Sequence, residues 1–346
     1  MNERSIWHLA LLAFFVTAVA LPLLGEILVA DPSIAVVGDR YYLIGTEDCA
    51  SAACSQIKSS ADAVFPVYVS EDLHSWRLAE TAAGDGRCLL KSSAFGKRDF
   101  WAPQLFERNK LWYFAYTSDY RWGIAVAERP EGPFRPWMSY QSKKGQAIDP
   151  FVFQDDDGRA YVYFSSAELN GMAGALLSAD LKTLAGEPVK CITNDQPWER
   201  LKLEQHYEEL NRKYGYIGWD KYCWGVGTTE GPTVIKRHGI YVMFYSANDF
   251  RSPDYCVGVA VADRPLGPWR KLQTGAVLSR ADTGFNGTGH GDVFVGPDGK
   301  LWYVFHAHHS AIRVNPRRTG VIRLRETLGS DGYPRYGVDR TTMRLL

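Results

Sequence analysis

The sequence of 346 residues lacks a charge imbalance, because 39 lysine and arginine residues are matched by 39 aspartate and glutamate residues. It also lacks a basic block and a basic stripe interleaved with aromatic residues. These absences argue against nucleic acid as a partner and against an electrostatically held membrane surface, since both need clustered positive charge. With 46% hydrophobic and 23% charged residues, the composition indicates a well-packed soluble protein.

The six cysteines include no CxxC pair, which argues against a zinc ribbon and a thioredoxin-like redox motif. They are Cys49, Cys54, Cys88, Cys191, Cys223 and Cys256. Only the short spacing of Cys49 and Cys54 suggests a particular disulfide, and the remaining pairings stay open.

Helical periodicity is confined to one segment, from Pro197 to Gly215. Its apolar side chains recur at helical spacing, at Leu203, Tyr207, Leu210 and Tyr214. Gly215 is suited to end a helix. We expect one short helical insertion here, which either shapes the rim of a site or covers exposed sheet.

An apolar run near the N-terminus has the layout of an export signal. Arg4 precedes the run from Leu9 to Ala20, which ends in the small-residue signature Ala18-Val19-Ala20. We predict a signal peptide over residues 1–20, and a secreted or periplasmic protein with no stable membrane partner once the signal is removed. The alternative is a retained N-terminal membrane anchor, because residues 21–30 are also mostly apolar.

The sequence contains a repeated hairpin motif, most clearly in IDPFVFQDDDGRAYVYFSS at residues 148–166. Two runs of β-forming residues flank a turn from Asp155 to Gly158. Pro150 has no N–H to donate to a central ladder, so it marks the entrance of the first strand. Asp149 then lies at the rim, where a side chain can meet solvent.

Four more copies follow the same layout, at DPSIAVVGDRYYLIGT from Asp31, APQLFERNKLWYFAYT from Ala102, GPTVIKRHGIYVMFYS from Gly231 and GDVFVGPDGKLWYVFHAH from Gly291. Their second positions fall at 32, 103, 150, 232 and 292, which gives steps of 71, 47, 82 and 60 residues. Each step can hold a four-stranded antiparallel unit with loops. We therefore predict an all-β fold, a single five-bladed β-propeller over residues 21–346 with one short helical insertion.

Three carboxylates stand at predicted strand entrances, Asp31, Asp149 and Glu230. In a propeller the first strands are innermost, so their entrances converge on one end of the axis. A carboxylic acid and a carboxylate in one funnel suit glycosidic hydrolysis, where the acid protonates the leaving oxygen and the base activates water. Glu230 stands one position early, so the strand must bend at Gly231-Pro232 for its side chain to join the others.

The motifs DPSI with YYLIGT, WAPQLF, IDPFVFQDDDG, TTEGPTV and GTGHGDVF, in this order, resemble glycoside hydrolase family 43. The resemblance covers essentially everything after the signal. It implies a five-bladed propeller that hydrolyses glycosides with inversion at the anomeric carbon. By motif position it implies Asp31 as general base, Glu230 as general acid, and Asp149 as the residue that orients and tunes the acid.

The resemblance also implies contacts with a carbohydrate substrate. Trp101, beside Phe100 in FWAPQL, resembles the aromatic wall of the family's sugar site, although a tryptophan buried between blades would give the same pattern. We place His290 in the fifth unit where Glu230 stands in the fourth, and expect it to hydrogen-bond in the cavity; a structural calcium ion held through water is the alternative. Arg318, in RRTGVIRLRE, resembles an arginine that reaches the sugar. No cofactor is required.

The resemblance implies α-L-arabinofuranosidic or β-D-xylosidic bonds as the target, and the sequence does not separate the two. The long insertion from Lys190 to Thr229 favours a pocket over an open groove. Two other functions remain to be distinguished. One is a non-catalytic glycan-binding propeller, which would tolerate the loss of a carboxylate, and the other is a fructosyl hydrolase or transferase of related fold, which retains anomeric configuration.

Overall fold

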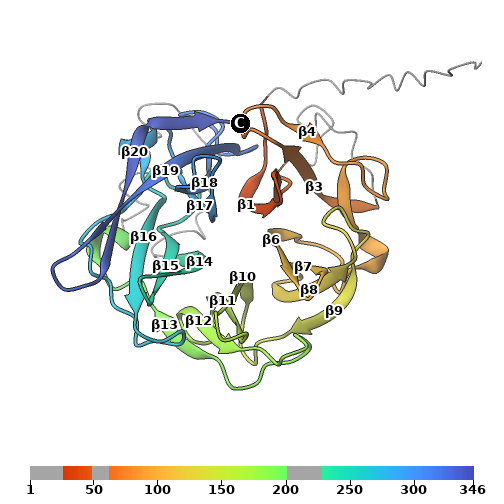
Figure 1. The fold of residues 1–346 in the computed structure, drawn as a ribbon, viewed down its shortest axis with the longest axis horizontal. Coiled ribbons are helices and arrows are strands. Elements are labelled where there is room, and N and C mark those ends of the chain that lie inside the picture. The colour runs from red at the N-terminus through yellow and green to blue at the C-terminus, as the bar shows by residue number, and fades with distance from the viewer. Residues whose placement is uncertain (1–25, 49–61, 201–227) are drawn as a thin grey trace, which may run out of the picture.

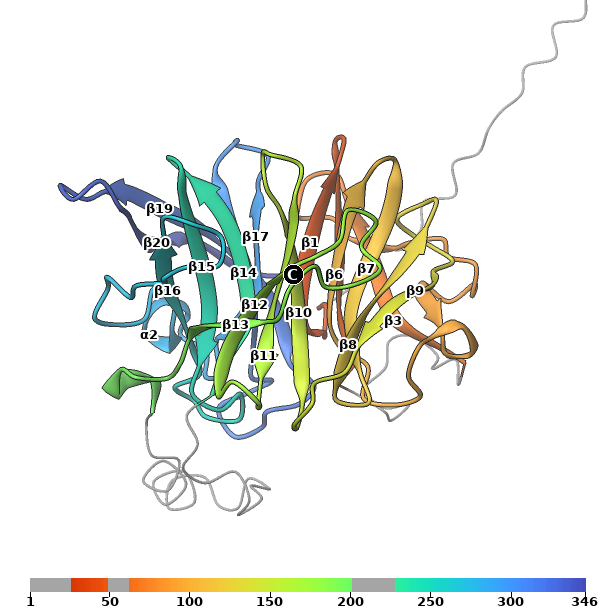
Figure 2. The ribbon, with the colours of Figure 1, turned by 90° about the horizontal axis from the view of Figure 1, so that it is seen from below.

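The computed structural model describes residues 26–48, 62–200 and 228–346. Within these ranges the chain forms five antiparallel sheets arranged around a central axis (Figure 1). In the side view the inner strands run along that axis (Figure 2). The predicted five-bladed β-propeller is confirmed.

The blades follow the order of the chain. Blade one consists of β1 (Ala30–Val37), β2 (Arg40–Thr46), β3 (Ala63–Ser70), β4 (Arg77–Leu78) and β5 (Arg87–Leu90), which pairs with β3. Blade two consists of β6 (Trp101–Arg108), β7 (Leu111–Ser118), β8 (Arg121–Ala127) and β9 (Arg135–Tyr140), and blade three of β10 (Ala147–Gln154), β11 (Ala160–Ser166), β12 (Gly171–Leu176) and β13 (Val189–Ile192). Blade four consists of β14 (Thr229–Arg237), β15 (Ile240–Ala247) and β16 (Cys256–Ala262), and blade five of β17 (Gly289–Val295), β18 (Leu301–Ala307), β19 (Arg318–Leu328) and β20 (Pro334–Leu345). The helical turns described are η1 (Lys91–Ser93), η2 (Pro197–Glu199) and α2 (Arg280–Thr283).

The hydrophobic core is divided into five clusters, each between two neighbouring blades. Both faces of a middle strand are therefore buried, which is why a strand such as β7, LWYFAYTS, is apolar along most of its length rather than alternating. Between blades one and two, Phe65 and Phe114 pack edge to face with ring centroids 5.0 Å apart. The blades are thus held by packing between sheets.

The ring closes where blade five meets blade one, a contact that we call the seam. The N–H of Ile27 donates to the carbonyl of Leu346 at 2.7 Å, and the N–H of Thr319 donates to the carbonyl of Ile27 at 3.1 Å. A hydrophobic cluster that contains Leu43 from blade one and Val304 from blade five fills the space beside these bonds. The seam is therefore formed without a strand shared between the two blades.

Each first strand has a β-bulge at its entrance, where the register with the second strand shifts. One residue in each bulge has a left-handed backbone, with φ of 48° at Asp31, 46° at Ala102, 58° at Asp149, 58° at Gly231 and 36° at His290. Such bulges re-aim side chains at the rims of sheets. The bend predicted at Gly231-Pro232 is present, and it follows the same geometry as in the other four blades.

The bulges correct the register that the sequence predicted for the fifth copy. Its shift lies between Gly289 and Asp292, so His290 corresponds to Asp31 and Asp149, and Gly289 corresponds to Glu230. The predicted alignment of the fifth copy is therefore displaced by one residue. This displacement arises because Gly291 replaces the proline that marks the strand entrance in the other copies.

A hydrogen bond between neighbouring blades satisfies the N–H of the left-handed residue, and we call it the inter-blade clamp. In four blades the acceptor is a side chain on the second strand of the preceding blade. The bonds run from Ala102 to Thr46 Oγ1 (2.8 Å), from Asp149 to Thr117 Oγ1 (2.8 Å), from His290 to Ser246 Oγ (2.8 Å) and from Asp31 to His306 Nδ1 (3.0 Å). In the fourth blade the N–H of Gly231 donates instead to the carboxylate of Asp149.

Some sequence predictions fall outside the described residues. These are the signal peptide over residues 1–20, the pair Cys49 and Cys54, and all of the predicted helix after Arg200. The described start of that segment is the 3₁₀ turn η2. None of the helices in the described part of the chain has the length and apolar character that a membrane span needs.

The inter-blade clamps should contribute measurably to stability. Thr117 is fully buried, and Thr117→Val keeps its shape while leaving the N–H of Asp149 without its acceptor. We expect the free energy of unfolding to fall by about 1 to 3 kcal/mol, measured by denaturant unfolding. Thr274→Val, at an exposed position, is the matched control and should change stability by less than about 0.5 kcal/mol. Equal effects of the two changes would contradict a stabilising role for the clamp.

Candidate active site

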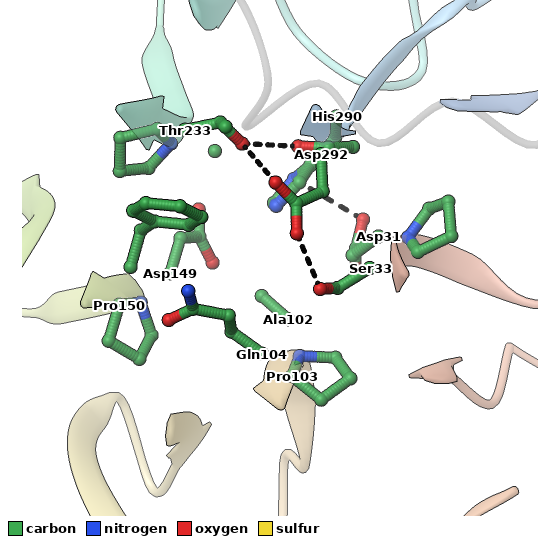
Figure 3. Close-up of a pocket in the computed structure, with 15 residues that line it drawn as sticks. Asp31, Ser33, Ala102, Pro103, Gln104, Asp149, Pro150, Thr233, His290 and Asp292 are labelled. Carbon is green, nitrogen blue, oxygen red and sulfur yellow. Dashed lines mark hydrogen bonds and ion pairs between the residues drawn. The ribbon is translucent and has the colours of Figure 1, made fainter. Parts of the chain in front are cut away.

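One cavity on the propeller axis is lined by residues from the entrances of all five first strands (Figure 3). Asp31, Asp149 and His290, three of the five left-handed bulge residues, present their side chains to it, together with Asp292 deeper in the strands. Glu230, one position before its bulge residue, lies outside the lining of this cavity, but it is close enough for its charge to act on Asp149 and for that of Asp31 to act on it. The structure therefore brings together the three carboxylates that the sequence selected.

Asp31 lies in a cationic and hydrogen-bonding environment. Thr46 Oγ1 donates to its Oδ2 at 2.7 Å, and Arg317 Nη1 donates to its Oδ1 at 3.1 Å. His290 Nδ1 lies 3.3 Å from the same Oδ1. Burial opposes ionisation of Asp31, but Arg317 and the histidines outweigh burial and hold its pKa well below the ordinary value. Asp31 is therefore a carboxylate over the whole neutral range.

Glu230 lies in the opposite kind of environment. Burial, together with the negative charges of Asp249 and Asp31, raises its pKa to about 7. The hydroxyl of Tyr255 donates to Glu230 Oε1 at 2.7 Å, which favours the ionised form and partly opposes that rise. Glu230 therefore carries a proton in a large part of the population near neutral pH.

Asp149, like Glu230, lies in an environment that opposes ionisation. Burial raises its pKa well above the ordinary value, and the charges of Glu230 and Asp31 raise it further. The N–H of Gly231 and the hydroxyl of Ser165, at 3.4 Å, partly offset this rise. Asp149 and Glu230 titrate as an interacting pair, so a second ionisation within the pair is disfavoured.

Several residues of this site were missed by sequence reasoning. His306 accepts the N–H of Asp31, and its ring stacks on that of Tyr255 with centroids 5.5 Å apart and planes 3° apart. The repeat could have indicated some of these positions, because Thr46, Ser246 and His306 occupy the same place near the end of the repeated hairpin. Tyr255, in the loop before β16, follows no repeated pattern.

The arginine that contacts Asp31 is Arg317, the neighbour of the predicted Arg318. Arg318 forms an ion pair with Glu26 and lies over the ring of Phe285, at 5.1 Å from its centroid. Because adjacent side chains leave the backbone in different directions, a shift of one residue decides which guanidinium reaches Asp31. The motif resemblance located the segment but not the residue.

The two aromatic residues proposed as a sugar wall differ in position. Phe100 is partly buried and packs against Phe65 and Tyr116 at the edge of the core between blades one and two, and its role as a substrate contact stays a prediction. Trp101 is partly buried at the entrance of β6, next to Ala102 in the cavity lining. Its ring meets Tyr120 edge to face at 5.4 Å, and Tyr120 is 45% exposed. Trp101 thus remains available as part of an aromatic rim.

Within residues 26–48, 62–200 and 228–346, no group of three or more histidine, cysteine, aspartate or glutamate side chains is arranged to hold a metal ion. Calcium prefers six to eight oxygen ligands, whereas His290 offers a ring nitrogen that faces Asp31. These contacts fit a hydrogen-bonding role for His290 better than direct calcium coordination.

The chain and its fold are similar to those of known glycoside hydrolases. The model of the family described as "Glycosyl hydrolases family 43" matches residues 24–332. Beta-D-galactofuranosidase xynD of Aspergillus niger is 26% identical over 298 residues, covering 80% of this chain and 73% of that protein. The extracellular exo-alpha-(1->5)-L-arabinofuranosidase ArbA of Cellvibrio japonicus is 24% identical and covers 89% of this chain and 87% of its own. A crystal structure of an endo-1,4-beta-xylanase from Bacteroides thetaiotaomicron has a TM-score of 0.71 at 29% identity, covering 91% of this chain and 95% of that one.

Removing the hydroxyl of Tyr255 should raise the pKa of Glu230 above its value of about 7, because that hydroxyl stabilises the ionised carboxylate. We expect a rise of roughly 1 to 2 units in Tyr255→Phe, from the strength of a hydrogen bond to a charged group. Titration of ¹³C-labelled glutamate by NMR measures it, with Glu230→Gln to assign the signal. Tyr303→Phe, at a buried tyrosine between blades four and five, is the control and should leave this pKa unchanged.

Proposed function

Because the chain belongs to glycosyl hydrolase family 43, we propose that it hydrolyses α-L-arabinofuranosidic or β-D-xylosidic bonds in plant-type polysaccharides or oligosaccharides, with inversion. The observation that carries this proposal is that the pKa values of two carboxyl groups, Glu230 and Asp31, are shifted in opposite directions. Burial and negative neighbours raise the pKa of Glu230 to about 7, while Arg317 helps to hold that of Asp31 well below its ordinary value. Carboxyl groups with separated pKa values are what acid and base catalysis at one bond requires.

In the proposed reaction Asp31 is the general base. Its ionised carboxylate takes a proton from a water molecule, whose oxygen attacks the anomeric carbon from the face opposite the leaving group. Glu230 donates its proton to the glycosidic oxygen as the bond from the anomeric carbon breaks. One water is consumed, and the proton balance closes when Asp31 returns a proton to solvent and Glu230 regains one.

Asp149 is proposed to keep the acid protonated. It interacts with Glu230 in a buried setting, so a negative charge on either carboxyl group disfavours ionisation of the other. The Tyr255 hydroxyl is proposed to stabilise Glu230 after proton transfer, because it donates a hydrogen bond to the ionised carboxylate. Trp101 and His290 are proposed substrate contacts, from the cavity lining and its rim.

The substrate class rests on the relatives and on the chemistry of the cavity. The similar proteins are described as a galactofuranosidase, an arabinofuranosidase and a xylanase, so all three act on glycans. We propose a pentoside as the scissile unit, with no cofactor. The description of the Cellvibrio relative as extracellular supports an exported protein. A glycan-binding module without catalysis would not need the opposed pKa values of Asp31 and Glu230.

The roles of the two carboxyl groups can be separated by the leaving group. Glu230→Gln should lower turnover of natural oligosaccharides by about 10² to 10⁴-fold, but that of nitrophenyl glycosides far less, because nitrophenolate leaves without protonation. Asp31→Asn should lower turnover of both by about 10² to 10⁴-fold, since both need an activated water. Hydrolysis of nitrophenyl arabinofuranoside, nitrophenyl xyloside and the matching oligosaccharides measures these effects. Full activity of Asp31→Asn, or glycan binding by an intact protein that cleaves no pentoside, would refute the proposal.

The stereochemistry of the first product separates inversion from retention. Inversion needs room for a water molecule, so we expect the carboxyl groups of Asp31 and Glu230 to be roughly 6.5 to 9.5 Å apart, rather than the roughly 5 Å of retaining enzymes. ¹H NMR of the anomeric proton, recorded before mutarotation, should show a product of opposite configuration to the substrate. A product of the same configuration would favour the fructosyl-type retaining mechanism.

A further inference from the structure

The guanidinium of Arg317 is shared unequally between two carboxylates. Its Nε donates to Asp48 Oδ2 at 2.7 Å and its Nη2 donates to Asp48 Oδ1 at 2.8 Å, a bidentate pair. Its backbone N–H donates to the same Oδ2 at 3.0 Å. Only Nη1 reaches Asp31, at 3.1 Å. Asp48 therefore holds the fork of the guanidinium, and Asp31 receives a single contact.

The three side chains of this arrangement are buried. The side chains of Arg317, Asp31 and Asp48 are 7 to 8% exposed. The guanidinium lies over the ring of Phe250, 4.9 Å from the centroid, which fixes its plane. In such a site a planar fork is a strong and directional partner for one carboxylate at a time. The identity of that carboxylate matters for the chemistry.

Without Asp48, Asp31 would be the carboxylate nearest to this cation. A bidentate pair with Asp31 would occupy both of its oxygens, and Oδ2 already accepts from Thr46. An aspartate engaged in this way is a poorer acceptor for a water proton, because its lone pairs and its charge are taken up by the arginine. In the observed geometry the bidentate pair of Arg317 is with Asp48, so Asp31 is not engaged in this way.

We propose that Asp48 is a positioning residue, which holds the fork of Arg317 so that the guanidinium orients Asp31 through one N–H and leaves it free to accept a proton from water. The expected effect on kcat rests on the proposed function. The expected effect on the contact between Arg317 and Asp31 rests on the observed hydrogen bonds alone. Asp48 acts through Arg317 and does not itself need to touch the substrate.

The test compares Asp48→Asn, which keeps the size of the side chain but not its charge, with the parent enzyme. We expect kcat to fall by about 10- to 100-fold, a part of the 10² to 10⁴-fold that a general base contributes. The fall should be equal for nitrophenyl glycosides and oligosaccharides, because the base serves both, and KM should change by less than about threefold. A crystal structure of the variant should show two guanidinium nitrogens on Asp31 instead of one.

Asp339→Asn is the matched control. Asp339 is also a buried aspartate that binds arginines, Arg323 and Arg325, but it lies on β20, away from the cavity. It should lose thermal stability while kcat stays within about twofold of the parent. If Asp48→Asn does not fold, Asp48→Ser removes the same charge with a smaller side chain.

The outcomes separate this inference from the proposed function. If the parent cleaves no glycoside, the proposed function fails, and the variant structure alone decides the role of Asp48. An unchanged Arg317 contact with Asp31 in that structure would overturn the inference. So would a kcat within twofold of the parent, a loss confined to KM, or a loss in Asp48→Asn and Asp339→Asn that simply follows their melting temperatures.

Discussion

The inter-blade clamp is the interaction on which both the ring and the site depend. A left-handed residue at a bulge turns its N–H away from the ladder, and a buried N–H without an acceptor is costly. Each of these N–H groups is therefore satisfied by the preceding blade. The same backbone turn that creates the need also directs the side chains of Asp31, Asp149 and His290 toward the axis. Closure of the ring and convergence of the carboxylates are two results of one backbone geometry.

Burial by itself would not give the three carboxyl groups of the site different ionisation states. It disfavours the charged form of Asp31, Asp149 and Glu230 alike. The asymmetry comes mainly from Arg317, with contributions from His290 and His306. Arg317 hydrogen-bonds to Asp31, and within the described part of the chain it has no such bond to Asp149 or Glu230. The position of Arg317 thus favours Asp31 as the anion, and its guanidinium contacts both Asp48 and the ring of Phe250.

The sequence predicted the features that repeat and missed those that do not. Five hairpins, four of them with proline at the strand entrance, were enough to predict the propeller and the convergence of Asp31, Asp149 and Glu230. The fifth copy was misplaced by one residue because Gly291 stands where proline marks the other strands. Arg317 was missed because its contact with Asp31 joins residues 286 positions apart, and a motif does not say which of two adjacent arginines points inward.

The seam differs from the other four junctions in the chemistry of its clamp. At the other junctions the acceptors are hydroxyl groups and, for Gly231, the carboxylate of Asp149. The acceptor for Asp31 is an imidazole, which must stay neutral to accept the N–H. Burial, aided by Arg317, lowers the pKa of His306 to about 3 from its ordinary 6.5, and the pKa of Asp31 is also depressed. For both groups the stabilisation is present above the unfolded-state pKa and is lost as pH falls through the folded-state value. Protonation of His306 at low pH therefore removes the acceptor of the clamp at the one junction where the ring closes, and the contact between blade one, which carries the proposed base, and blade five should weaken there.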